Sequence, residues 1–240
     1  MFCTALGSYA LYPMGFYELQ PRYECNYNRL GDGQSWYPCT NVDFCQNLQF
    51  DLDPRNDTGH VLTTDMLPEY RVVESPVSLD NWIQQYGLQC APKNQFGLFG
   101  SSFFIGLVLG SFIVPRISDL YGRKKLAIFG CITHFLASML VLITHSFGLS
   151  IAMIFIMGFS MGGRAFVGYV FMSEHMKTAD VARVTSLYFF MDSSGIFWAA
   201  LYFKYVSKDW RLIFGFPSVV LIFAIYAYSL QDETPKFFYG

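Results

Sequence analysis

The chain has 240 residues, of which 53% are hydrophobic, 19% aromatic and only 14% charged, and its formal net charge is −2. Soluble globular proteins carry about 25% charged residues, so this composition excludes an ordinary soluble domain. The charges are also distributed unevenly: residues 17–95 hold eleven acids and five bases, whereas the rest of the chain holds seven acids and eleven bases. The sequence therefore predicts two environments, one polar and acidic, the other apolar and mildly basic.

The first apolar stretch covers residues 2–16 and is short for a transmembrane helix, which needs about 20 apolar residues. A secretory signal peptide is the alternative, but the stretch lacks a basic leader and a clear small-x-small cleavage site. We therefore expect a partial first transmembrane helix over residues 1–17.

Residues 18–94 are predicted to form a disulfide-tied extracytoplasmic loop. Four of the six cysteines lie here: Cys25, Cys39, Cys45 and Cys90. Four cysteines allow three pairings, among which the sequence does not choose. Asn56 begins the only N-x-S/T glycosylation motif of the chain and lies in the same segment. A single motif arises easily by chance, so the prediction depends on its coincidence with the cysteines and the acidic composition.

Five apolar segments follow, and each is long enough to cross a bilayer. They cover residues 96–115, 126–144, 151–171, 185–205 and 212–230. Together with the first segment they predict an all-α membrane protein, a six-transmembrane-helix bundle with a large loop between helices 1 and 2. Helices 2–6 then occupy residues 95–232, and residues 233–240 begin a cytoplasmic linker.

The basic residues between these segments predict their orientation, because cytoplasmic loops are enriched in Lys and Arg. The connection after the second helix carries Arg116, Arg123, Lys124 and Lys125, whereas residues 145–150 carry no Lys or Arg. The former is therefore expected on the cytoplasmic side and the latter outside. The predicted outer connection before the last helix contradicts the rule mildly, because it contains three bases: Lys204, Lys208 and Arg211.

The most informative motif lies in the connection 114–125, which reads VPRISDLYGRKK. Four of its residues match the signature G-x-x-x-D-R-x-G-R-K/R of the major facilitator superfamily: Asp119, Gly122, Arg123 and Lys124. Pro115 replaces the leading Gly of the signature, and Leu120 replaces its first Arg. The chain thus resembles this superfamily, in which the loop closes a cytoplasmic gate. The resemblance implies that Glu174 and Arg183 complete the gate network.

Two further motifs narrow the resemblance. Arg164-x-x-x-Gly168 is similar to the R-x-x-x-G motif of the fourth helix of the superfamily. Residues 233–237 read ETPKF and resemble the P-E-S-P-R-W motif of organic cation and organic anion transporters. The large first loop favours this organic-ion branch over the sugar porters. The resemblance covers the chain as the N-terminal six-helix half of a twelve-helix family.

Arg164 and Asp192 are the candidate substrate-binding charges, because an ionisable residue inside a membrane helix costs about 2.5–3.5 kcal/mol on insertion scales. The alternative for Arg164 is an interhelical hydrogen-bond anchor. Asp192 either pairs with Arg164 or binds a cationic substrate together with the aromatic rings of Tyr188 and Phe189. Phe171 lies on a stripe with Arg164 that could line the same cavity, although such a stripe more often packs in a core.

Small residues are expected to let the helices approach closely. Gly106-x-x-x-Gly110 lies in the second predicted helix, and Gly162 and Gly163 lie in the fourth. Residues without bulky side chains are typical of close helix–helix contacts in membranes.

We expect the chain to transport small organic ions by alternating access, with cations slightly favoured over anions. The alternative is a transport-inactive half-transporter retained as a structural subunit of a larger membrane complex, which the altered gate motif and the missing second half favour. Expected partners are the organic ion, the lipid membrane, and a second six-helix half or other membrane subunits. We expect no enzymatic activity, cofactor, metal site or nucleic-acid partner. The predicted location is the plasma membrane, as a multi-pass integral protein, with another cellular membrane as the alternative.

Overall fold

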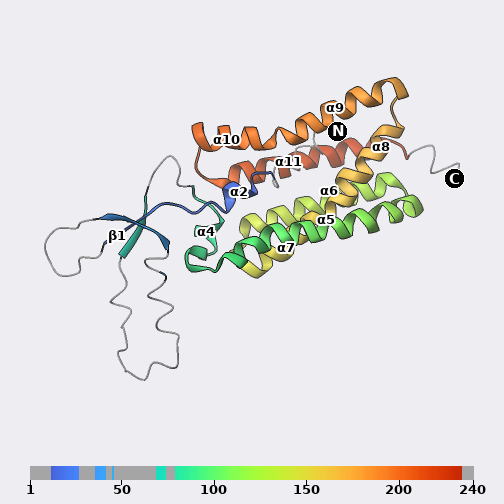
Figure 1. Cartoon of the computed structure of the whole chain (residues 1–240). Helices are drawn as coiled ribbons and strands as arrows, with labels where there is room; N and C mark the ends of the chain where they lie inside the picture. The colour runs from blue at the N-terminus through green and yellow to red at the C-terminus, as the bar shows by residue number, and fades with distance from the viewer. Residues whose placement is uncertain (1–11, 27–35, 42–44, 46–68, 74–78, 234–240) are drawn as a thin grey trace.

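The computed structural model describes residues 12–26, 36–41, 45, 69–73 and 79–233. Long helices run side by side in a bundle, and a small sheet and the short helix α4 (Trp82–Gln85) lie at one end of it (Figure 1). Most described residues are therefore helical, as predicted, and the sheet is a correction to the all-α prediction.

Four helices in the described part of the chain are long and apolar enough to cross a membrane. They are α5 (Lys93–Tyr121), α6 (Arg123–Ile143), the composite helix α7–η4–α8 (Phe147–Glu174) and α11 (Trp210–Ser229). They confirm four of the predicted segments. Each helix is longer than or shifted from its predicted apolar run, because polar residues at the membrane border continue the same hydrogen-bonded backbone.

The composite helix changes its winding in the middle. It consists of α7 (Phe147–Met161), the π-helical segment η4 (Gly162–Val167) and α8 (Gly168–Glu174). A π-helical turn inserts an extra residue into a helix and is frequent at functional sites. Here it contains Arg164, so the backbone irregularity coincides with a predicted site residue.

The fifth predicted segment forms two consecutive helices, α9 (Thr178–Ser193) and α10 (Gly195–Tyr205), which follow one another along the bundle in Figure 1. Ser194 separates them, and its hydroxyl donates to the backbone oxygen of Met191 at 2.8 Å. Such a side-chain bond competes with the helical ladder. Residues 2–11 of the first predicted segment lie outside the described residues, which include the short helix α2 (Met14–Tyr17). The count of six membrane helices thus stays a prediction.

The sheet belongs to the predicted loop and has the strand order β2-β1-β3. Its strands are β1 (Tyr23–Asn26), β2 (Tyr37–Cys39) and β3 (Glu69–Val72), all paired antiparallel. These strands are only three or four residues long and therefore leave little periodic signal in the sequence. Across the sheet, Arg71 Nη2 forms an ion pair of 2.7 Å with Glu24.

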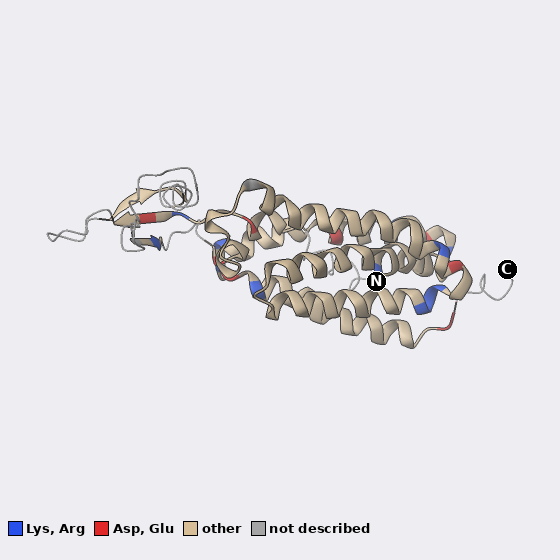
Figure 2. Cartoon of the chain, turned by 90° about the horizontal axis from the view of Figure 1, so that it is seen from below, with Lys and Arg blue, Asp and Glu red and all other residues tan. Residues whose placement is uncertain are grey.

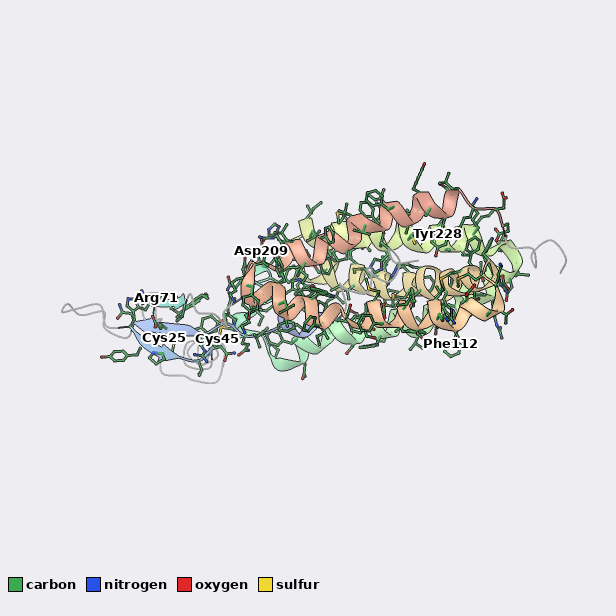
Figure 3. All side chains as sticks on the ribbon, turned by 90° about the horizontal axis from the view of Figure 1, so that it is seen from above. Cys25, Cys45, Arg71, Phe112, Asp209 and Tyr228 are labelled. Carbon is green, nitrogen blue, oxygen red and sulfur yellow. A yellow bond between two sulfur atoms is a disulfide. The ribbon has the colours of Figure 1, made fainter. Side chains whose placement is uncertain are left out.

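Two disulfides tie this end of the molecule together. Cys25 bonds to Cys39 across β1 and β2, and Cys45 bonds to Cys90 in the short helix η3 (Leu88–Cys90). The structure therefore contains one of the three pairings that the sequence left open. Figure 3 shows Cys25 and Cys45 at this end and Tyr228 toward the other end of the molecule.

The loop is attached to the bundle through polar and aromatic contacts. The Asp80 amide donates to the backbone oxygen of Lys208 at 3.1 Å, and Arg211 Nη1 lies 3.9 Å from Asp80 Oδ2. Trp82 and Trp210 pack edge to face, with ring centroids 5.7 Å apart. Arg211, one of the bases that contradicted the orientation rule, thus faces an acid of the loop.

Glycines place α5 directly against α7. A Cβ added to Gly106 would overlap the Phe155 backbone oxygen, and one added to Gly158 would overlap the Phe103 backbone oxygen. The predicted close helix approach therefore occurs here, because only hydrogen occupies the space between the two backbones.

Candidate functional site

Charged side chains gather at the two ends of the bundle and on the sheet, with few along the middle (Figure 2). The candidate substrate-binding charges are Arg164 in η4 and Asp192 in α9. Arg164 has a relative exposure of 0%, whereas Asp192 is half-buried. Only the second of these charges is therefore accessible to a small ligand.

Asp192 lies one helical turn after Tyr188 on α9 and receives a hydrogen bond from the N-terminal segment. The Tyr12 hydroxyl donates to Asp192 Oδ2 at 2.8 Å, although the two residues are 180 positions apart. The Ser193 side chain lies close to the same hydroxyl. Within the described part of the chain, Asp192 forms no ion pair with Arg164, so that alternative is not realised.

An aromatic cluster connects α8 to α9 beside this acid. The ring of Tyr169 lies 6.4 Å from that of Tyr188 and 6.3 Å from that of Phe189, measured between centroids. Tyr188 is buried, whereas Phe189 is 55% exposed. The Tyr169 hydroxyl lies 3.2 Å from Thr185 Oγ1, which holds the two helices together.

The structure places the other two predicted substrate residues in packing positions. Arg164 is enclosed where the composite helix crosses α6, since a Cβ on Gly130 would overlap its backbone nitrogen. Phe171 is buried against Tyr228, with ring centroids 5.5 Å apart, in a core formed by α6, α8 and α11. Arg164 and Phe171 therefore differ from Asp192, Tyr188 and Phe189, which the structure brings together.

The predicted gate residues lie at the end of the bundle opposite the sheet. Arg123 Nη2 lies 3.1 Å from Asp119 Oδ1, and Arg123 Nη1 forms an ion pair with Glu174. The Glu174 side chain is only 10% exposed, whereas that of Asp119 is 65% exposed. Because solvent weakens exposed pairs, the Arg123–Glu174 pair contributes more than the Arg123–Asp119 pair.

Gly122 and Lys124 shape the same turn. Gly122 joins α5 to α6 with φ 101°, a backbone conformation that favours glycine. The Lys124 amide donates to Glu233 Oε1 at 3.0 Å, and its Nζ donates to the Ser229 backbone oxygen at 3.1 Å. Lys124 therefore ties the start of α6 to the end of α11, a contact that the motif did not predict.

Three positions depart from the expected network. Pro115 lies inside α5, which nevertheless continues to Tyr121. Leu120 is 76% exposed and supplies no charge where the signature has an Arg. Arg183 is exposed on α9 and makes no polar contact with the residues that the structure describes.

A cavity of about 680 Å³ lies between α8 and α9. Its lining includes Glu174 of the predicted gate together with Tyr169 and Thr185 of the aromatic cluster. The cavity therefore extends from Glu174 to the contact between Tyr169 and Thr185. No group of three or more metal-ligating side chains occurs among the described residues, and Asn56 lies outside them.

Comparison with known proteins identifies the family. Residues 47–240 match the family described as "Sugar (and other) transporter". The Organic cation/carnitine transporter 6 of Arabidopsis thaliana is 30% identical over 162 residues, which cover 64% of this chain and 30% of that protein. The D-xylose transporter of Levilactobacillus brevis is 25% identical over 146 residues, covering 60% of this chain and 32% of that protein.

A solved structure, the POT family transporter PepTSo, has a TM-score of 0.48 and 15% identity, covering 98% of this chain and 38% of that chain. The chain thus spans about a third of the length of the relatives that it matches. The family match covers most of the sequence and confirms the resemblance drawn from the gate motif. The chain belongs to the sugar (and other) transporter family of the major facilitator superfamily, whose members are multi-pass membrane transport proteins rather than enzymes.

Proposed function

We propose that this chain takes part in the transport of small organic cations across a membrane by alternating access. The observation that carries the proposal is the half-buried Asp192, whose carboxylate lies beside the aromatic cluster and is held by an uncharged donor, Tyr12. Among the described residues no base forms an ion pair with Asp192, so its charge attracts a cation, and aromatic faces add cation–π attraction.

The names of several relatives support this substrate class. Several carry the name organic cation/carnitine transporter, while another carries the name D-xylose transporter. A carboxylate can accept hydrogen bonds from a sugar, but only a cation gains Coulombic attraction from its charge as well. The negative charge at Asp192 therefore favours the cation over the sugar.

We also propose that the contacts around Arg123 form the cytoplasmic gate. The ion pair with the shielded Glu174 links the α5–α6 turn to the end of α8, and Lys124 links it to α11. Breaking these contacts would let the helix ends separate. The cavity between α8 and α9 supports this reading, because it lies directly behind the gate acid.

The proposed layout follows the sequence prediction: a first helix over residues 1–17, an extracytoplasmic loop over 18–94, helices 2–6 over 95–232, and a linker from 233. The loop then faces outward and carries a glycan at Asn56. Alternating access needs a second helical bundle, so a six-helix half is the expected partner, and the plasma membrane is the expected location.

Uptake measurements test the function. Cells that produce the full gene product containing this chain are given radiolabelled tetraethylammonium or the organic anion p-aminohippurate. We expect saturable uptake of the cation only, and its loss in Asp192→Asn. The matched control is Asp180→Asn, which removes an exposed acid from the first turn of the same helix. Equal uptake by the Asp192→Asn variant would contradict the proposed site.

A transport-inactive structural subunit is the second candidate. It is favoured by Leu120 and Arg183, because the first supplies no gate cation and the second contacts none of the described gate residues. Native-gel migration of the membrane-extracted protein distinguishes the two: a discrete high-mass band together with absent uptake supports the subunit.

A further inference from the structure

The Tyr12 hydroxyl is directed at the Asp192 carboxylate. It donates its single proton to Asp192 Oδ2 at 2.8 Å, and the Ser193 side chain lies close to the same hydroxyl. Tyr12 is 37% exposed and Asp192 is half-buried, so the pair lies at an accessible surface of the site rather than in the core. The Tyr12 hydroxyl thus holds one oxygen of the carboxylate in a set direction.

This arrangement affects which cations the acid can accept. A carboxylate offers about four lone-pair positions, and leaving them unsatisfied away from water is costly. A quaternary ammonium has no N–H group, so it cannot satisfy any of them. A primary ammonium has three donors and binds best when those positions are open. The Tyr12 hydroxyl occupies one lone-pair position of the Asp192 carboxylate. Because this donor carries no charge, the negative charge of Asp192 stays available to a cation.

We propose that Tyr12 is a specificity-determining residue that makes the Asp192 site prefer fully alkylated ammonium cations over cations with N–H donors. The inference rests on the proposed function, in which Asp192 binds an organic cation. With Tyr12 in place, a quaternary head is held by charge and by the rings of Tyr188 and Phe189, and the carboxylate keeps its hydrogen bond. Without the hydroxyl, a primary ammonium can donate an N–H to the freed lone pair of Asp192. A quaternary ammonium has no N–H group and gains nothing there.

The test compares two probes with the same body: N,N,N-trimethylphenethylammonium and phenethylammonium. Uptake of each is measured in cells that produce the full gene product, and KM and maximal rate are determined separately. For Tyr12→Phe, which keeps the ring, we expect the KM of the primary amine to fall relative to the KM of the quaternary cation by about tenfold. This is the scale of one hydrogen bond to a charged group. Maximal rates should change little. A merely structural role would change both probes equally.

The control is Tyr226→Phe, which removes the hydroxyl of an exposed tyrosine on α11. It should leave the ratio unchanged. An unchanged ratio in Tyr12→Phe overturns the inference even if Asp192→Asn abolishes uptake of both probes, and in that case the proposed function survives. Uptake that is insensitive to Asp192→Asn overturns both.

A second variant covers the case in which Tyr12→Phe does not reach the membrane. Ser193→Ala removes a side chain that lies close to the Tyr12 hydroxyl and leaves the bond of that hydroxyl to Asp192. We expect the KM ratio to shift in the same direction by about twofold, because the hydroxyl is then held less firmly on the carboxylate. A ratio identical to that of the wild type in Ser193→Ala would then overturn the inference.

Discussion

Arg164 and Asp192 are charged residues on two helices of the bundle, yet their surroundings differ. Arg164 is fully enclosed in the π-helical turn, where a glycine of α6 meets its backbone. Asp192 lies just before the break between α9 and α10, beside the partly exposed Tyr12 and Phe189. The comparison shows that a charge in the bundle belongs to the fold when packing encloses it. It is available to a ligand when small residues and a helix break leave one side accessible.

The largest expected effect is a loss of stability that distinguishes the enclosed Arg164 from the accessible Asp192. Arg164→Ala should lower the free energy of unfolding by about 2–5 kcal/mol, since it empties a fully buried site that the surrounding helices cannot refill. Thermal unfolding of the detergent-purified protein measures this loss. Asp192→Asn should leave the midpoint nearly unchanged, and a comparable fall in both variants would contradict the comparison.

The close packing of α7 against α5 can be disrupted without changing a charged residue. Gly158→Ala on α7 forces a methyl group against the Phe103 backbone and should cost about 1–3 kcal/mol in the same unfolding measurement. Gly148→Ala is the matched control on the same helix, because nothing lies within 4 Å of its added Cβ. It should be neutral or slightly stabilising.

The next prediction tests the proposed gate contact between Arg123 and Glu174. With Thr185→Cys as a reporter in the cavity, Glu174→Gln should speed its labelling by a membrane-impermeant maleimide by about threefold to tenfold, because the ion pair with Arg123 is lost. The double variant Arg123→Glu/Glu174→Arg should restore slow labelling. Lys125→Gln, an exposed base in the same turn, should not change the rate.

The smallest effect concerns pH at the first residue of the loop. Burial raises the pKa of the Glu18 carboxyl from 4.5 to about 7, so the folded state holds its proton more firmly than the unfolded state. Stability from this group is present below about pH 4.5 and is lost as the pH rises through about 7. The melting temperature should therefore fall between pH 5 and pH 8, and Glu18→Gln should flatten that slope. An equal slope in the variant would refute the assignment.

The predicted gate residues are the part of the candidate site that the sequence described best. Asp119 and Arg123 are four positions apart on continuous backbone, and a short motif placed Glu174 near them. Tyr12 and Tyr169 were missed, because no local pattern indicates a contact between 12 and 192 or between the rings of α8 and α9. The strands were missed because they are too short to show alternation.

The sequence by itself determined four segments that are apolar enough to cross a membrane and the positions of the predicted gate charges along the chain. Both are one-dimensional properties, set by the length of an apolar run and the order of neighbouring charges. Only the tertiary structure decided that Arg164 is enclosed, that Phe171 packs against α11, and that Tyr12 holds Asp192. These outcomes depend on which helix faces meet, and residues 180 positions apart come together only when the whole bundle packs.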